Sequence, residues 1–206
     1  MQVSVGREKA KRNIIIFIVG VFLAFLATVL NSIGDAVDNS VLSYFGFLSV
    51  VGVIFQIIAI YCLRNVNRRY ASAMWALILN LLLTITTIIL FAIYIATVNE
   101  SLETAISWMD TATSFSEALI VIYFVLGTNE LAEENGKGMP VLTKSIIYGY
   151  MGIFIISLIF FFLSFIPAIK ENQTVVTMFA IMGIVLYVVR EVSYVFFLIR
   201  SLWRVK

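Results

Sequence analysis

Three charged residues, Glu117, Arg190 and Glu191, interrupt long apolar stretches of this sequence. A charge at the centre of a lipid bilayer costs about 2.5–3.5 kcal/mol on insertion scales, whereas each Leu or Ile returns only about 0.3–0.6 kcal/mol. Such residues are therefore expected to pair with one another or to line a polar site. A carboxylate with a raised pKa in apolar surroundings is also what a proton-coupled site uses.

Helical depth places further polar residues beside them. At a rise of 1.5 Å per residue, Gln56, Asn80, Glu117 and Arg190 all lie about 12–17 Å from the basic ends of their apolar stretches. We predict that Glu117 faces Arg190 in this layer. The alternative is that Glu117 and Arg190 form a purely structural ion pair, which fixes the register of the helices. The predicted midplane layer and candidate binding site consists of Gln56, Asn80, Glu117, Tyr187, Arg190, Glu191 and Tyr194.

A polar stripe leads towards this layer. Asp110, Thr113 and Ser114 share a helical face with Glu117 at i+3 and i+4 spacing. This stripe predicts an entry route from the outer surface, or ordinary hydrogen bonding between helices, in which Ser and Thr are frequent.

Small residues form a second pattern near the N-terminus. Gly20, Ala24, Ala27 and Asn31 recur at spacings that place them on one helical face. Small residues let two helices approach closely. The face is interpreted as packing against a neighbouring helix of the same chain, with a partner helix from another subunit as the alternative.

Several kinds of chemistry lack the residues they need. The sequence has no histidine and one cysteine, Cys62, so the commonest metal ligand and the usual near-neutral acid–base group are missing. No glycine-rich phosphate loop or nucleophile–histidine pair occurs. We expect no metal, no cofactor and no enzymatic activity, and the net charge of +2 gives no reason to expect nucleic-acid binding.

The elements that carry these residues are apolar and long. Hydrophobic residues make up 62% of the 206 positions and charged residues only 13%, about half the usual charged share of a soluble domain. Lipid must therefore be the solvent for most of the chain. A single all-α transmembrane domain without a soluble domain is predicted over 1–206, with spans at about 13–33, 41–63, 71–97, 106–128, 145–168 and 174–199.

Basic residues predict the orientation. Of the 14 Lys and Arg residues, 12 fall on the side of the two termini if the N-terminus is inside. The positive-inside rule then predicts that both termini are cytoplasmic. Short acidic connections predict three antiparallel hairpins, in a multi-pass protein of a bacterial cell membrane.

The best functional prediction is a transporter, channel-like protein or substrate-binding membrane subunit whose site is the midplane layer. Six helices in about 206 residues resemble the architecture of substrate-binding subunits of energy-coupling-factor vitamin transporters, although the first outer connection is shorter. The alternatives are a non-enzymatic membrane interaction or regulatory protein, and a membrane enzyme of unrecognised type. The expected partners are the lipid bilayer, a small-molecule or ion ligand, and a membrane protein or second copy of the chain.

Overall fold

A computed structural model describes most of the chain. The backbone is described for residues 2–36, 47–97, 100–134, 136–163 and 173–204. Within these ranges, side chains are described for all residues except 2–7, 31–36, 100, 157, 160–161, 173, 176, 179–180, 183–184 and 187.

Helices account for all the regular structure in the described part of the chain, as the composition predicts. There are six: α1 (Gln2–Ala36), α3 (Phe47–Leu63), α4 (Arg68–Thr97), α5 (Glu100–Glu133), α6 (Pro140–Leu163) and α8 (Gln173–Arg204). Several extend beyond the predicted spans. Residues 100–105, which we predicted to connect two spans, and residues 129–133, which follow the predicted end of a span at 128, both belong to α5. Both segments contain Glu, Leu or Ala, which are strong helix formers.

Two short turns reverse the chain at one end of the molecule. Between α3 and α4, the side-chain oxygen of Asn67 accepts a hydrogen bond of 2.7 Å from the backbone N–H of Arg69, which caps the start of α4. Between α5 and α6, Gly136 adopts a positive φ of 66°, and the backbone N–H of Met139 donates to the side chain of Asn129 over 2.7 Å.

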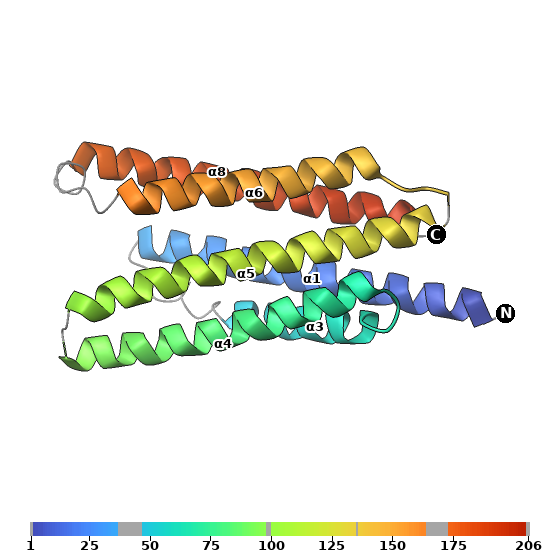
Figure 1. Ribbon diagram of the computed structural model, residues 1–206, viewed down its shortest axis with the longest axis horizontal. Coiled ribbons are helices and arrows are strands. Elements are labelled where there is room, and N and C mark those ends of the chain that lie inside the picture. The colour runs from blue at the N-terminus through green and yellow to red at the C-terminus, as the bar shows by residue number, and fades with distance from the viewer. Residues whose placement is uncertain (1, 37–46, 98–99, 135, 164–172, 205–206) are drawn as a thin grey trace.

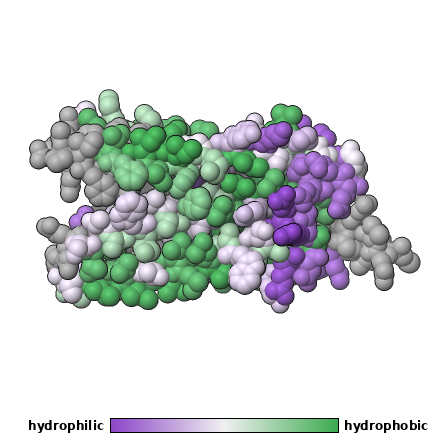
Figure 2. All heavy atoms as spheres, viewed as in Figure 1, coloured by the Kyte–Doolittle hydropathy of each residue, from purple (hydrophilic) through white to green (hydrophobic). Residues whose placement is uncertain are grey.

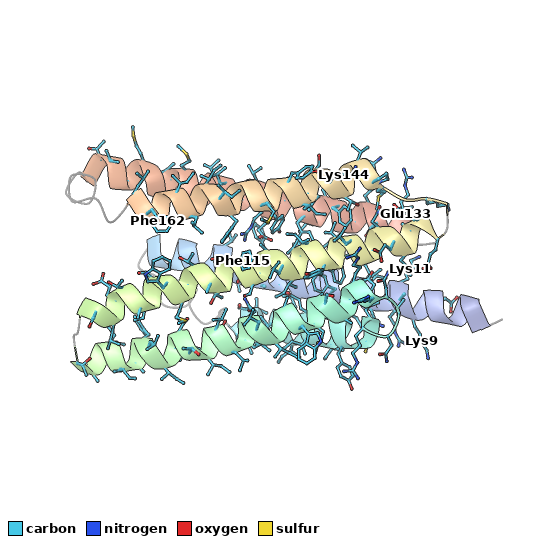
Figure 3. All side chains as sticks on the ribbon, viewed as in Figure 1. Lys9, Lys11, Phe115, Glu133, Lys144 and Phe162 are labelled. Atoms are coloured by element: carbon cyan, nitrogen blue, oxygen red, sulfur yellow. The ribbon has the colours of Figure 1, made fainter. Side chains whose placement is uncertain are left out.

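The helices run side by side along the long axis of the molecule (Figure 1). α1 packs against α3, α4 against α5, and α6 against α8, while α5 also contacts α6 and α8. α1 begins and α8 ends at the same end of the bundle (Figure 1). We call this the basic end; Lys9, Lys11, Glu133 and Lys144 lie towards it (Figure 3).

The surface of the bundle is a broad apolar band beside a hydrophilic basic end (Figure 2). Large apolar side chains are exposed on different helices, for example Phe22 on α1, Ile88 on α4 and Val192 on α8. Contiguous apolar surface of this kind is rare on soluble monomers. The protein is therefore a helical membrane protein.

Three helices of the described chain contain segments long and apolar enough to cross a membrane. They are Glu8–Leu30, Arg68–Thr97 and Ser101–Glu133. Phe47–Leu63 and Pro140–Ile156 are shorter apolar helices. The six-span topology, the three hairpins and the side on which the termini lie remain predictions.

The core lies towards the basic end. The buried residues of α4, from Tyr70 to Leu77, all fall within its first ten positions. There the rings of Phe17 and Phe124 stack with centroids 3.7 Å apart, and Tyr70 meets Phe124 edge-on at 5.4 Å. Phe17 and Leu77 also line the cavity described next, so the polar site rests directly on this core.

Candidate functional site

A cavity of about 240 Å³ lies inside the bundle, with lining residues from all six helices. Six of the seven residues of the predicted midplane layer line it: Gln56 from α3, Asn80 from α4, Glu117 from α5, and Arg190, Glu191 and Tyr194 from α8. The seventh, Tyr187, has a side chain outside those that the structure describes. α6 contributes Tyr150.

Arg190 and Glu191 form the ion pair of this cavity. Nη2 and Nε of Arg190 donate to the same carboxylate oxygen of Glu191 at 2.8 and 3.0 Å, and both side chains are largely buried. The Arg190 guanidinium also lies over the ring of Tyr150, 5.1 Å from its centroid, which adds a cation–π contact.

We predicted that Glu117 faces Arg190; the two residues line one cavity and interact electrostatically, but the ion pair of Arg190 is with Glu191. Glu117 shares the cavity with Arg190, yet no ion pair joins these two residues, both of which the structure describes. Their equal depth led us to pair Arg190 with Glu117 across the bundle, and adjacent residues diverge by about 100° around a helix. The long arginine side chain instead bends back to its neighbour on α8.

Glu117 faces the open part of the site. Its side chain is exposed, although its neighbours on α5, Ser116 and Ala118, are buried. Because Arg190 and Glu191 cancel each other's charge, an ionised Glu117 leaves the cavity with a net charge of −1. The carboxylate is the group in this cavity best placed to bind a cation or accept a proton.

Asn80 fixes the helix that carries Glu117. Its side-chain amide donates to the hydroxyl of Ser116 at 2.8 Å and to the carbonyl of Thr113 at 3.2 Å. The Ser116 hydroxyl in turn donates to Thr113 O over 2.7 Å. These bonds hold α4 against α5 next to Glu117, so the amide of Asn80 positions the site.

Tyr194 offers a further polar atom. Its side chain is only 2% exposed, and its hydroxyl has no hydrogen-bond partner among the described residues. A buried polar group without a partner costs about 1–3 kcal/mol.

The predicted entry stripe lies away from the cavity. Asp110 and Ser114 are exposed and Thr113 is half-buried, but none of the three lines the cavity. The Thr113 hydroxyl donates to the carbonyl of Met109 on its own helix, so part of the stripe serves local bonding. The cavity instead continues between α1 and α3, where Thr28 and Ser49 line it.

The small residues of α1 pack within the chain. A Cβ added to Gly20 would lie 2.6 Å from the carbonyl oxygen of Gly52 on α3, and a Cβ on Gly52 would lie 2.9 Å from the backbone nitrogen of Ala24. Ala27 is fully buried, and Asn31 lies outside the described side chains. The interpretation as packing against a neighbouring helix therefore fits this face.

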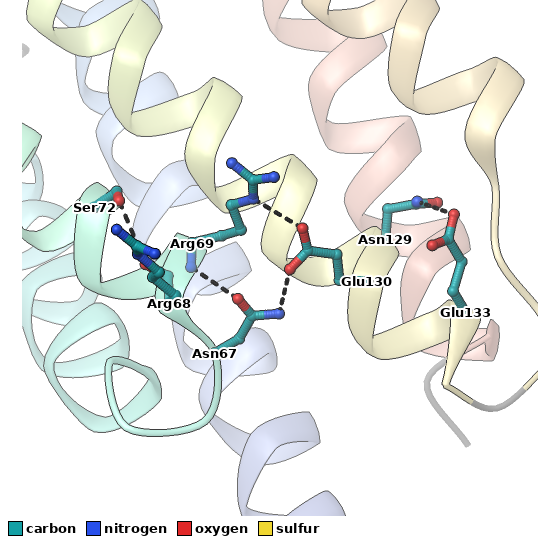
Figure 4. Close-up of polar contacts among 7 residues, drawn as sticks. All are labelled: Asn67, Arg68, Arg69, Ser72, Asn129, Glu130 and Glu133. Atoms are coloured by element: carbon teal, nitrogen blue, oxygen red, sulfur yellow. Dashed lines mark hydrogen bonds and ion pairs between the residues drawn. The ribbon is translucent and has the colours of Figure 1, made fainter.

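A polar cluster at the basic end was not anticipated from the sequence. Glu130 on α5 accepts a hydrogen bond of 2.6 Å from Asn67 and pairs with Arg69 at 2.8 Å (Figure 4). Nearby, the hydroxyls of Tyr70 and Thr128 lie 3.0 Å apart in the core. The sequence feature that could have predicted this cluster is the pair of opposite charges at Arg69, near the start of α4, and Glu130, near the end of α5.

The described residues contain no group of three or more acidic, cysteine or histidine side chains placed to hold a metal ion. Comparisons with protein-family models, with curated proteins and with solved structures find no match for this chain.

Proposed function

We propose that this membrane protein is a small transporter or channel-like protein that binds a monovalent cation in the cavity beside Glu117. The observation that carries the proposal is an exposed carboxylate within the bundle, in a cavity whose other two charges form an ion pair. Charged residues at membrane depth commonly mark ion or substrate pathways.

The size of the cavity supports a small ligand. Pockets for drug-sized molecules measure about 300–1,000 Å³, whereas this one measures about 240 Å³. A metal cation, a proton with water, or a small organic ammonium ion fits this volume. Gln56 and Asn80 also line the cavity, and amide oxygens are among the ligands that metal cations accept.

The proposed setting is a bacterial cell membrane crossed six times by three hairpins, with both termini in the cytoplasm. Glu117 is near the middle of α5, which spans Glu100–Glu133, so its carboxylate would lie near the bilayer midplane. A midplane site between helices is the usual arrangement in secondary transporters.

The alternative functions lack an observation of their own. The interaction protein was proposed from the small-residue face of α1, of which Gly20 and Ala24 lie against Gly52 of α3 within the chain. A purely structural ion pair accounts for Arg190 with Glu191, but it gives no role to Glu117.

Carbodiimide labelling tests the proposal on the purified protein in liposomes. Dicyclohexylcarbodiimide attaches to carboxyl groups in apolar surroundings, and peptide mass spectrometry locates the adduct. We expect labelling at Glu117 that Li⁺, Na⁺, K⁺ or methylammonium suppresses in a saturable manner. Equal labelling with all four cations present would contradict cation binding.

Uptake measurements connect binding with transport. In proteoliposomes, we expect Glu117→Gln to reduce uptake of the protecting cation at least about tenfold, since a contact with a charged group contributes about 1.5–3 kcal/mol and about 1.4 kcal/mol is a factor of ten. Glu103→Gln, on the same helix but exposed and remote from the cavity, is the matched control and should keep wild-type uptake. Normal uptake by folded Glu117→Gln protein would refute the proposal.

A further inference from the structure

A second, larger hollow lies between α6 and α8. It measures about 400 Å³, and its walls are mostly apolar, with Ile146 and Ile153 from α6 facing Val192 and Phe196 from α8. Val192 and Phe196 are themselves exposed, so this groove opens onto the apolar outer surface of the bundle. Among the described residues it shares Tyr150 and Arg190 with the Glu117 cavity, and its other lining residues differ from those of that cavity.

A third hollow continues this groove to the basic end. It measures about 410 Å³ and is lined by the start of α6 and by Arg200 and Arg204 of α8. Leu142 and Ser145 line both hollows. The two hollows therefore adjoin along α6 and α8, the first mostly apolar and the second bordered by two arginines. We call the two together the groove, with its cationic end at Arg200 and Arg204.

The cationic end has unbalanced positive charge. Arg200 and Arg204 are four residues apart on α8, where like charges repel each other, and neither forms an ion pair with any residue that the structure describes. The positive end of the α6 dipole, at Pro140, adds to the same potential. Glu133 packs against Gly138 at the edge of this hollow, where Asn129 donates to its carboxylate.

We infer that this groove binds one anionic phospholipid, with the phosphate at Arg200 and Arg204 and an acyl chain between α6 and α8. Basic pockets between membrane helices at the cytoplasmic side bind anionic headgroups. The dimensions agree. From Arg200 to Val189, the last lining residue on α8, eleven residues at 1.5 Å each span about 16 Å, which is about half of a hydrocarbon core of about 30 Å.

Gly149 keeps the groove open. A Cβ added to it meets no atom within 4 Å, and the residue lines the apolar section. A larger side chain there would occupy the space of the acyl chain without disturbing the helices. Gly152, nearly one turn further along α6, also has open space around an added Cβ but does not line the groove.

Native mass spectrometry of delipidated protein in detergent tests the inference. We expect one phosphatidylglycerol molecule to bind at least about tenfold more tightly than phosphatidylcholine, since each nearby basic residue contributes roughly a fivefold preference for anionic lipid. The soluble headgroup analogue glycerol 3-phosphate should not displace the lipid at equal concentration. Displacement would identify a soluble phosphate ligand in place of a lipid and overturn the inference.

Two variants separate the headgroup from the chain. Arg200→Gln with Arg204→Gln should abolish the preference for phosphatidylglycerol, whereas Arg64→Gln with Arg68→Gln, which removes two charges from the start of α4 and the turn before it, should keep it. Gly149→Leu should weaken binding of both lipids at least about fivefold, and Gly152→Leu should not. Equal losses in a test variant and its control, or wild-type binding by either test variant, would overturn the inference.

Discussion

At the residue scale, the polar contacts of this bundle differ in how much water surrounds them. The Arg69–Glu130 pair is exposed, with side-chain exposures of 46% and 37%, and exposed pairs of this kind contribute only about 0–1 kcal/mol. The Tyr70–Thr128 contact is fully buried. Substitution in the buried hydroxyl pair is therefore expected to lower the free energy of unfolding more than substitution in the exposed ion pair.

Tyr70→Phe removes one hydroxyl and leaves the ring contact with Phe124. Because the Thr128 hydroxyl still donates to the carbonyl of Phe124 over 2.8 Å, no buried donor is orphaned. We expect a loss of about 0.5–1.5 kcal/mol in the free energy of unfolding, the range of hydrogen bonds between membrane helices. Reversible unfolding in mixed micelles measures it. The control Tyr61→Phe, on an exposed ring, should change stability by less than about 0.5 kcal/mol.

At the element scale, the helices are joined by two kinds of contact. α1 and α3 approach so closely at Gly20 and Gly52 that backbone lies against backbone. α6 and α8 leave a groove between them, and Gly149 lies in open space. Two glycines in the same bundle thus serve opposite purposes, the first permitting contact and the second keeping volume free.

Alanine substitution distinguishes these two glycines. In Gly20→Ala the new methyl would lie 2.6 Å from the Gly52 carbonyl oxygen, so α1 and α3 must separate, and we expect a loss of about 1–3 kcal/mol. Gly149→Ala meets no atom and should be neutral or stabilising by up to about 1 kcal/mol, since alanine favours the helix. Thermal unfolding in detergent compares them. A larger loss for Gly149→Ala would show that α6 packs differently.

At the scale of the whole molecule, charge and apolar surface are separated along the long axis. α1 begins and α8 ends at the hydrophilic end, and apolar residues predominate over the middle of the face in view (Figures 1 and 2). This separation is what a bilayer requires, because the hydrocarbon excludes charge and the positive-inside rule holds basic residues in the cytoplasm.

Labelling of single cysteines tests the predicted orientation. In a Cys62→Ser background, we expect Lys9→Cys and Lys144→Cys to react with a membrane-impermeant maleimide only after cells are permeabilised. Glu103→Cys, at the other end of the bundle, should react in intact cells. All three parent side chains are exposed, so accessibility within the protein does not bias the comparison. The reverse pattern would invert the topology.

The sequence by itself determined that lipid is the solvent of this protein, and it predicted a common depth for four polar residues. Apolar runs of about 20 residues with few charges lead to helices, because hydrocarbon cannot hydrogen-bond exposed backbone. Fixed rise per residue then places Gln56, Asn80, Glu117 and Arg190 at one level. These four residues line one cavity.

Only the tertiary structure decided which polar side chains contact one another. Depth along a helix says nothing about rotation or side-chain reach, so Arg190 bonded to adjacent Glu191 instead of Glu117, and the Asp110 stripe lay away from the cavity. The groove between α6 and α8 depends on how far two helices stand apart. That distance is set by packing among side chains from different helices, and no single stretch of sequence contains it.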